Sequence, residues 1–310
     1  MRVVAALGGN AFVPAGAALS VEGEFRFARE ALSRLEPFLP PSVELLVTHG
    51  NGPQVGHQLD RVERSRASAY PLPLDVCVAL TQGELGYVLA EALRMTLGEA
   101  GVDRAVAAIV TRVEVSPGDP AFHDPSKPIG PVVGAAEAAA LRARGAVLRD
   151  DAGRGLRRVV PSPEPRRVLE AGVIRSLLSQ GVVVVAAGGG GVPLLASETG
   201  LRGVEAVVDK DLTAALLADF VGADLLAVLT DVPCAYTDFR SPRQAPVGRV
   251  TARKALALLS DGHFAPGSMG PKMAACARFA SRPGRRAVIC DPPGLALALR
   301  GESGTVVVPE

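Results

Sequence analysis

The sequence predicts an α/β protein with a largely parallel, buried central sheet. Short runs rich in β-branched residues alternate with longer amphipathic segments, which is the pattern of strands joined by helices. The strand-like runs are almost wholly apolar, as strands covered by helices on both faces require. With 310 residues and 48% hydrophobic content, the chain can bury a large core in one or two lobes.

Seven apolar runs are predicted to be strands: VVAAL, VELLVTH, AVAAIV, VVVVAA, LLAVLT, AVIC and TVVVP. Five amphipathic segments are predicted to be helices: 22–39, 80–97, 166–178, 211–221 and 271–280. Residues 116–165 break this alternation, because they are rich in Pro, Gly, Asp and Arg around a short helix expected at 135–144. An irregular segment of that length inside a compact domain indicates a functional flap or a small inserted subdomain.

Charge and cysteine content exclude several function classes. The 33 basic and 32 acidic residues give a net charge of +1, so no global field favours nucleic acid or an anionic membrane. The four scattered cysteines form no CxxC pair, which argues against a zinc site or a disulfide framework and predicts reduced core thiols. The start of the chain does not resemble a signal peptide, and no apolar run approaches the roughly 20 residues of a membrane span, so we expect a cytoplasmic protein.

Glycine-rich turns follow three of the predicted strands, in ALGGNA, THGNGPQVG and AAGGGGVP. Open α/β sheets bind ligands at the carboxyl ends of their strands, so these turns can converge on one crevice. Glycine lets backbone N–H groups approach a phosphate closely, although each turn alone could equally be a tight strand-to-helix connection. No GK[ST] closes a glycine run, and GGGGVP lacks the dinucleotide spacing, which disfavours P-loop and Rossmann sites.

Lysine is scarce in this chain, since only Lys127, Lys210, Lys254 and Lys272 occur among 33 basic residues. Lys254 lies in an amphipathic segment and is expected on a solvated face. The other three lie in stretches bounded by Gly or Pro, where surface charge is the simple interpretation and a shared phosphate site is the alternative. A compact, mobile ammonium suits a moving phosphoryl group better than a planar guanidinium does.

Two of these lysines are expected at helix starts. Pro271 suits the first position of a helix, which would put Lys272 in the first turn. Positive charge there is unfavourable for folding, because it adds to the positive end of the helix dipole, but it favours binding of a polyphosphate. Lys210 is flanked by Asp209 and Asp211, which either cap a helix or orient the lysine side chains by ion pairing. Phosphoryl transfer depends on such positioned positive charge more than on covalent chemistry.

Nine stretches in order resemble the carbamate kinases of the amino acid kinase family: ALGGNA, THGNGPQVG, TQGELGY, DPAFHDPSKPIGP, RRVVPSP, GGGGVP, GVEAVVDKDLTAALLA, LTDV and FAPGSMGPK. The resemblance covers nearly the whole chain, and FAPGSMGPK and SKPIGP are specific to carbamate kinases. It implies a three-layer αβα sandwich with two lobes: residues 1–205 for the acceptor, carrying a protruding subdomain at about 116–165, and residues 206–310 for the nucleotide. It also implies a homodimer that reversibly transfers a phosphoryl group between ATP and carbamate, giving ADP and carbamoyl phosphate, with Mg²⁺.

The resemblance assigns roles by position. The implied catalytic residues are Lys127, Lys210, Asp211 and Lys272. Contacts to the transferred phosphate and the acceptor are implied for Gly8, Gly9, Asn10, Gly50, Asn51 and Gly52. The nucleotide pocket is implied to include Asp231, Tyr236, Met269 and Gly270, while no metal ligand is assigned. His49 receives a structural or positioning role, because carbamate is already an oxyanion and needs no general base.

Two other functions remain open from the sequence. One is a related kinase with a larger carboxylate acceptor, which would need an additional Arg or Asn clamp that the sequence does not identify. The other is a nucleotide sensor of the same fold without turnover, against which the three lysines and Asp211 speak.

Overall fold

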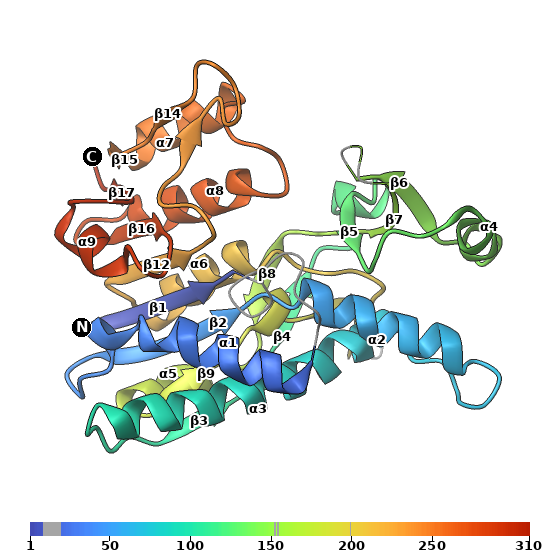
Figure 1. The fold of residues 1–310 in the computed structure, drawn as a ribbon, viewed down its shortest axis with the longest axis horizontal. Helices are drawn as coiled ribbons and strands as arrows, with labels where there is room; N and C mark the ends of the chain where they lie inside the picture. The colour runs from blue at the N-terminus through green and yellow to red at the C-terminus, as the bar shows by residue number, and fades with distance from the viewer. Residues whose placement is uncertain (9–19, 152, 154, 199) are drawn as a thin grey trace.

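The computed structural model describes residues 1–8, 20–151, 153, 155–198 and 200–310. Its centre is an eight-stranded sheet with the order β15-β17-β16-β12-β1-β2-β9-β3 (Figure 1). The strands are β1 (Arg2–Leu7), β2 (Glu44–His49), β3 (Val106–Ala108), β9 (Val183–Val185), β12 (Leu225–Leu229), β15 (Arg249–Thr251), β16 (Arg286–Cys290) and β17 (Thr305–Val308). All neighbours are parallel except β16 and β17. The predicted strands are therefore confirmed, and β15 is added at one edge.

Alternate residues of each strand face opposite layers of helices. In β1, Val4 and Ala6 belong to one core cluster, while Val3, Ala5 and Leu7 belong to the other, and all are fully buried. Because successive side chains of a strand point to opposite faces, an apolar run without polar interruptions specifies burial on both sides. The result is the three-layer αβα sandwich that the family resemblance implies.

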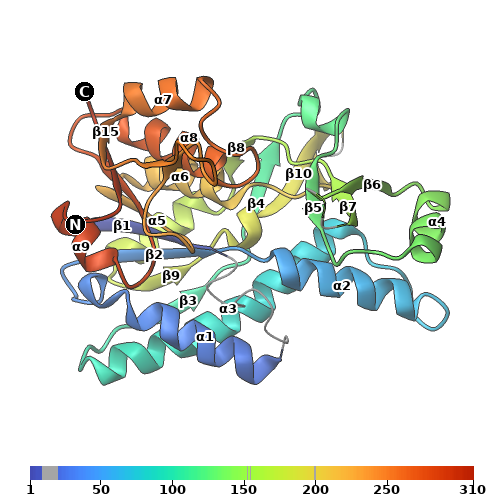
Figure 2. The same cartoon turned by 45° about the horizontal axis from the view of Figure 1, so that its top comes forward.

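Helices cover both faces of the sheet (Figures 1 and 2). One layer contains α1 (Val21–Ser33), α3 (Leu74–Glu99) and α9 (Leu295–Arg300). The other layer contains α5 (Ala171–Ser179), α6 (Lys210–Val221), α7 (Ala252–Ser260) and α8 (Met269–Ala280). Single turns of 3₁₀ helix occur at Glu36–Phe38, Pro120–Phe122 and Gly188–Gly190.

The helix bounds differ from the sequence expectation in several places, and one helix was not expected. The helix expected at 22–39 ends at Ser33, and the one expected at 80–97 spans Leu74–Glu99. The helix expected at 166–178 begins only at Ala171, because Pro165–Val168 forms strand β8. The helix expected from Pro271 begins at Met269, so Pro271 is its third residue, although Lys272 still lies in the first turn. Helix α2 (Gly52–Ser65) was not expected, because its first residues carry glycine and proline that favour a turn.

A protruding subdomain extends to one side of the sandwich (Figure 1). It contains a three-stranded sheet of order β5-β7-β6, made of β5 (Lys127–Ile129), β6 (Val147–Asp150) and β7 (Leu156–Val160), and helix α4 (Ala135–Ala143). A second sheet, of order β11-β10-β4-β8, lies near its base and contains β4 (Arg112–Val115), β10 (Val192–Ser197) and β11 (Gly200–Gly203). A small hairpin pairs β13 (Tyr236–Thr237) with β14 (Ala245–Pro246). The irregular segment therefore folds around a small sheet and a helix of its own.

Helix α3 is the one helix in the described part of the chain that is long and apolar enough to cross a membrane. This corrects the expectation that no segment has that length, although 56% of its apolar window is buried inside the protein. Its buried face packs against the sheet through Val88, Leu89, Ala92 and Leu93, so α3 is a core helix. The prediction for the cysteines is confirmed, since all four are free and buried: Cys77, Cys234, Cys276 and Cys290.

Candidate active site

Neighbouring strands β1, β2 and β9 end side by side, and each leads into a glycine turn. Gly8 follows β1 and donates its N–H to the carbonyl of Leu229 at 2.9 Å, where an added Cβ would lie 3.1 Å from that oxygen. Gly50 follows β2 and donates to the carbonyl of Leu7 at 3.1 Å. The turns therefore converge as expected, while Gly9 and Asn10 lie outside the described residues.

The turn after β9 packs directly against the turn after β2. A Cβ on Gly188 would lie 2.4 Å from Nε2 of His49, and a Cβ on Gly189 would lie 2.2 Å from Nδ2 of Asn51. A side chain at either position would collide with the buried side chains of His49 and Asn51. Gly188 and Gly189 of AAGGGGVP therefore make room for the HGNG turn, a role that spacing alone did not reveal.

His49 is a buried, neutral imidazole. Burial lowers the pKa of His49 to about 4, outweighing its hydrogen bond to a backbone carbonyl, while the charge of Lys210 lowers it further. Its Nδ1 lies 3.0 Å from the carbonyl oxygen of Gly50, so Nδ1 carries the proton. This arrangement fits the structural role expected for His49, since a group that stays neutral at pH 7 adds no charge to the site.

Two side chains of the stretch TQGELGY on helix α3 hold neighbouring segments of the site, Thr81 the HGNG turn and Gln82 the backbone of Thr111 after β3. Buried Asn51 donates from Nδ2 to Oγ1 of Thr81 at 2.8 Å. Gln82 accepts from the N–H of Thr111 at 2.7 Å and donates to the carbonyl of the same residue at 3.1 Å. The sequence reasoning assigned no role to Thr81 or Gln82, because hydrogen-bond partners from different elements become visible only in the folded chain.

Lys210 and Lys272 meet on one carboxylate. Asp211 accepts from Lys210 Nζ on Oδ1 at 2.5 Å and from Lys272 Nζ on Oδ2 at 2.9 Å. The Asp211 side chain is 3% exposed, against 11% for Lys210 and 15% for Lys272. Both lysines come from the first turn of their helices, α6 and α8. The carboxylate thus fixes two ammonium groups beside each other, which is the orienting role considered for Asp211.

Burial and pairing act in opposite directions on these three groups. Burial lowers the pKa of Lys210, and the neighbouring Lys272 charge adds to this, although Asp211 opposes it. Burial also disfavours the Lys272 ammonium, but Asp211 outweighs it and raises the pKa of Lys272. Burial disfavours the Asp211 carboxylate too, yet the two lysines outweigh it and hold its pKa below the usual range. Asp211 therefore favours the charged form of both lysines in a desolvated site.

Lys127 reaches the same helix start from the protruding subdomain. Its Nζ donates to Oδ2 of Asp209 at 2.8 Å, and the other oxygen of Asp209 accepts from the N–H of Asp211 at 2.9 Å. Asp209 is thus the expected N-cap of α6 and, in addition, the partner of Lys127. Three of the four lysines therefore meet at residues 209–211, while Lys254 is exposed on α7, as expected.

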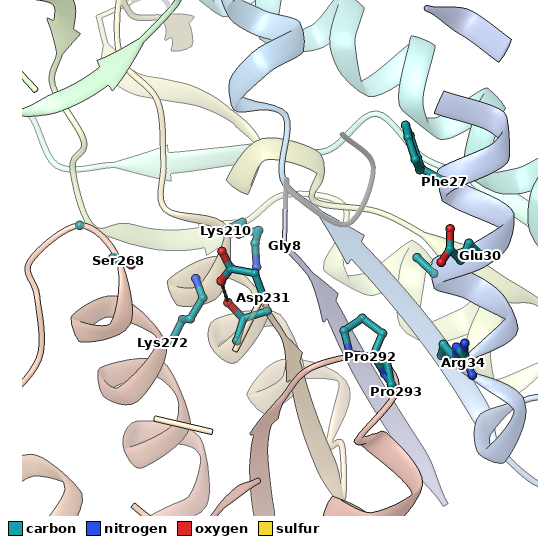
Figure 3. Close-up of a pocket in the computed structure, with 13 residues that line it drawn as sticks. Gly8, Phe27, Glu30, Arg34, Lys210, Asp231, Ser268, Lys272, Pro292 and Pro293 are labelled. Carbon is teal, nitrogen blue, oxygen red and sulfur yellow. Dashed lines mark hydrogen bonds between the residues drawn. The ribbon is translucent and has the colours of Figure 1, made fainter. Parts of the chain in front are cut away.

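A cavity of about 400 Å³ opens beside Gly8, Lys210 and Lys272 (Figure 3). It extends past Asp231, Ser268 and Pro292 at the carboxyl ends of β12 and β16 and at the start of α8. Helix α1 forms the opposite wall with Phe27, Glu30 and Arg34. No sequence pattern indicates this wall, because a charged residue on an amphipathic helix is normally exposed to solvent.

The other expected nucleotide residues lie outside the cavity lining. Tyr236 is half-buried in β13 with its ring centroid 5.9 Å from that of Phe239. Met269 packs against the core, and Gly270 donates its N–H to the carbonyl of Ala265 at 3.0 Å. These residues shape the start of α8 and the adjoining hairpin.

The described residues contain no group of three His, Cys, Asp or Glu side chains placed to hold a metal ion. Protein sites for Mg²⁺ bound with a nucleotide typically offer only one or two carboxylates and rely on the phosphates for the remaining ligands. Asp231 on the cavity wall fits that pattern.

Comparisons with known proteins agree with this geometry. The model of the amino acid kinase family matches residues 1–291. A carbamate kinase from Thermococcus kodakarensis is 43% identical over 314 residues, covering 100% of this chain and 99% of the relative, and one from Trichomonas vaginalis is 41% identical with 100% of both covered. The structure of a carbamate kinase from Giardia lamblia bound to AMP-PNP matches with a TM-score of 0.92 at 36% identity, covering 100% of this chain and 98% of that one. The chain therefore belongs to the amino acid kinase family and, within it, to the carbamate kinases.

Proposed function

We propose that this chain catalyses reversible phosphoryl transfer between ATP and carbamate, forming ADP and carbamoyl phosphate. The observation that carries the proposal is the meeting of Lys127, Lys210 and Lys272 at residues 209–211, beside both the glycine turns and the cavity. A sensor of nucleotide needs no such charge on the transferred group. The relative from Giardia lamblia, whose structure holds AMP-PNP, supports ATP as the nucleotide.

The lysines stabilise the phosphoryl group as it moves. Its transition state spreads negative charge over three equatorial oxygens, so preorganised cations lower the barrier. Lys210 and Lys272 lie at the cavity, and Lys127 approaches from the subdomain. Carbamate attacks through its own oxyanion, so the neutral, buried His49 is not required as a base. The N–H groups of Gly8 and Gly50 are already donated to Leu229 and Leu7, so the acceptor would take its backbone donors from Asn51 and Gly52 of the HGNG turn.

The two lobes divide the substrates. We assign carbamate to the first lobe, residues 1–205, whose HGNG turn after β2 offers backbone N–H groups. The nucleotide lies in the cavity beside α6 and α8 of the second lobe, residues 206–310. Mg²⁺, bound with the phosphates and held to the protein by Asp231, would supply further positive charge to the nucleotide. Free, buried thiols fit a reducing cytoplasm.

The decisive experiment is a coupled assay of ATP formation from ADP, Mg²⁺ and carbamoyl phosphate. Turnover with carbamoyl phosphate and none with acetylglutamyl phosphate would support the small acceptor site. Binding of ADP without turnover on any acyl phosphate would instead identify a sensor and overturn the proposal.

Replacing Lys127 with alanine is expected to lower turnover by at least about tenfold, equivalent to roughly 1.4 kcal/mol of barrier. ADP affinity should stay unchanged, because Lys127 approaches from the subdomain and does not line the cavity. The matched control is Lys254→Ala, which removes an exposed lysine on α7. Initial rates and calorimetric titration with ADP measure the two quantities, and full turnover in Lys127→Ala would remove this lysine from the mechanism.

We propose that the chain forms a homodimer through an uncovered face on α3. Val76, Leu80 and Tyr87 form a stripe along this helix and are 37%, 44% and 63% exposed, and nearby Val110 is 49% exposed. Strand β3 pairs on only one side, so its other edge is open among the described strands. A second copy of the chain would cover both features.

Tyr87→Glu is therefore expected to weaken dimerisation by at least about a hundredfold, since a charge would replace a buried aromatic at the interface. Light scattering across a dilution series measures the change. Tyr70→Glu is the control, because Tyr70 is 82% exposed and lies beyond α2, away from this stripe. A monomeric wild-type protein would reject the dimer.

A further inference from the structure

Helix α2 and the protruding subdomain touch through two glycines. A Cβ added to Gly56 would lie 2.5 Å from the Cα and 2.8 Å from the backbone N of Gly130. These are backbone atoms, so no flexible side chain can move aside to make room. Gly56 lies inside α2, and Gly130 directly follows strand β5, with a φ of +72° that favours glycine. The contact therefore depends on Gly56 lacking a side chain, whereas a Cβ on Gly130 would lie 3.9 Å from the Cα of Gly56 and only the φ of Gly130 favours glycine there.

Other interactions hold β5 in its position against α2. Buried Ile129 packs into one apolar cluster with Val55 and Leu59 of α2. Arg157 of β7 donates from Nε to the carbonyl of Gly130 at 2.9 Å and pairs with Asp151 at 2.8 Å. Packing and hydrogen bonds thus hold β5 against α2, and the contact between Gly56 and Gly130 determines the distance between the two elements.

The same short strand carries Lys127. Lys127 lies three positions before Gly130, and its ammonium reaches Asp209 at the start of α6. Helix α2, on the other side of the contact, begins at Gly52 of the HGNG turn. The glycine contact therefore connects helix α2, which begins at the HGNG turn, with strand β5, which carries Lys127.

We propose that Gly56 is a positioning residue for the transfer reaction, because its contact with Gly130 sets the height from which Lys127 approaches the phosphoryl group. The inference deepens the proposed function and depends on it. Ordinary contact of a Cβ begins near 3.4 Å, so a methyl group at Gly56 moves β5 by about 1 Å. A displacement of about 1 Å can cost about a hundredfold in rate without touching the reacting atoms.

The first test compares Gly56→Ala with Gly172→Ala. Gly172 is an exposed helical glycine in α5, and a Cβ there meets nothing within 4 Å, so the same change has no clash. Gly56→Ala is expected to lower kcat for ATP formation by between about tenfold and about a hundredfold. ADP affinity should stay unchanged, because the cavity is lined from α1, α6 and α8. Circular dichroism and ADP titration establish that the variant is folded, and a wild-type kcat in Gly56→Ala would overturn the inference.

The second test is a double-mutant cycle with Lys127→Ala. If Gly56 acts only through Lys127, adding Gly56→Ala to Lys127→Ala should change kcat by less than about twofold. Losses that multiply would show that Gly56 acts elsewhere and would reject the inference. If Gly56→Ala does not fold, Ile129→Val replaces it in the cycle, because this change weakens the packing of β5 against α2 without introducing a clash.

The proposed function and the inference fail in different ways. A wild-type protein without turnover rejects the proposed function itself. Wild-type turnover together with full activity in Lys127→Ala leaves the kinase in place and rejects only the positioning role.

Discussion

Asp211→Asn is expected to lower turnover by at least about a hundredfold, equivalent to roughly 2.7 kcal/mol of barrier. Asparagine keeps the shape of the side chain but removes the negative charge shared by Lys210 and Lys272. Burial already disfavours both ammonium groups, so the variant loses the interaction that favours their charged form. The loss should fall on kcat more than on ADP affinity, because Asp211 orients the lysines while the cavity walls hold the nucleotide.

The pH dependence of turnover in Asp211→Asn gives a second test, because its direction can be predicted. Without the carboxylate, the pKa of Lys210 falls further below its usual range, and the pKa of Lys272 loses the cause of its rise. A lysine is charged below its pKa, so turnover of the variant should recover partly as pH is lowered. The wild-type rate should show no such recovery over the same range.

Asp219→Asn is the matched control for this variant. Asp219 lies near the other end of α6 and pairs with Arg282 at 2.9 Å, so the charge change is the same and the site is untouched. Rates across a pH series and calorimetric titration with ADP provide both measurements. A pure loss of ADP affinity with unchanged kcat would contradict the orienting role of Asp211.

The central sheet could be predicted because its signal is local. Each strand is a short, β-branched run that must be buried on both faces, and the helices between them have one apolar side. Helix α2 was missed for an equally local reason. Its opening residues Gly52 and Pro53 favour a turn, and tertiary packing of Val55 and Leu59 outweighs that preference.

The site was predictable in its residue types but not in its partners. Two signals pointed to the three lysines that the structure brings together: lysine is scarce in this chain, and glycine or proline lies near each of the three. The pairing of Lys127 with Asp209, which is 82 residues away in sequence, depends on how the subdomain folds back. The same holds for the contact of Gly56 with Gly130 and for the α1 wall of the cavity, since no local pattern encodes them.

Lys272→Arg tests why this site uses lysine in a chain that otherwise prefers arginine. Lys272 places one ammonium on Oδ2 of Asp211 and leaves Oδ1 to Lys210. A guanidinium presents two parallel donors and favours both carboxylate oxygens at once, so arginine competes with Lys210 for its partner. Its longer, planar fork also enters a position where the present side chain is only 15% exposed.

We therefore expect Lys272→Arg to lower kcat by at least about tenfold, equivalent to roughly 1.4 kcal/mol, although the formal charge is unchanged. Lys254→Arg, at an exposed position on α7, should keep the wild-type rate and controls for the exchange itself. The coupled assay of ATP formation measures both variants under identical conditions. Equal rates in Lys272→Arg and the wild type would mean that charge alone suffices at this position, and the preference for a compact ammonium would have to be abandoned.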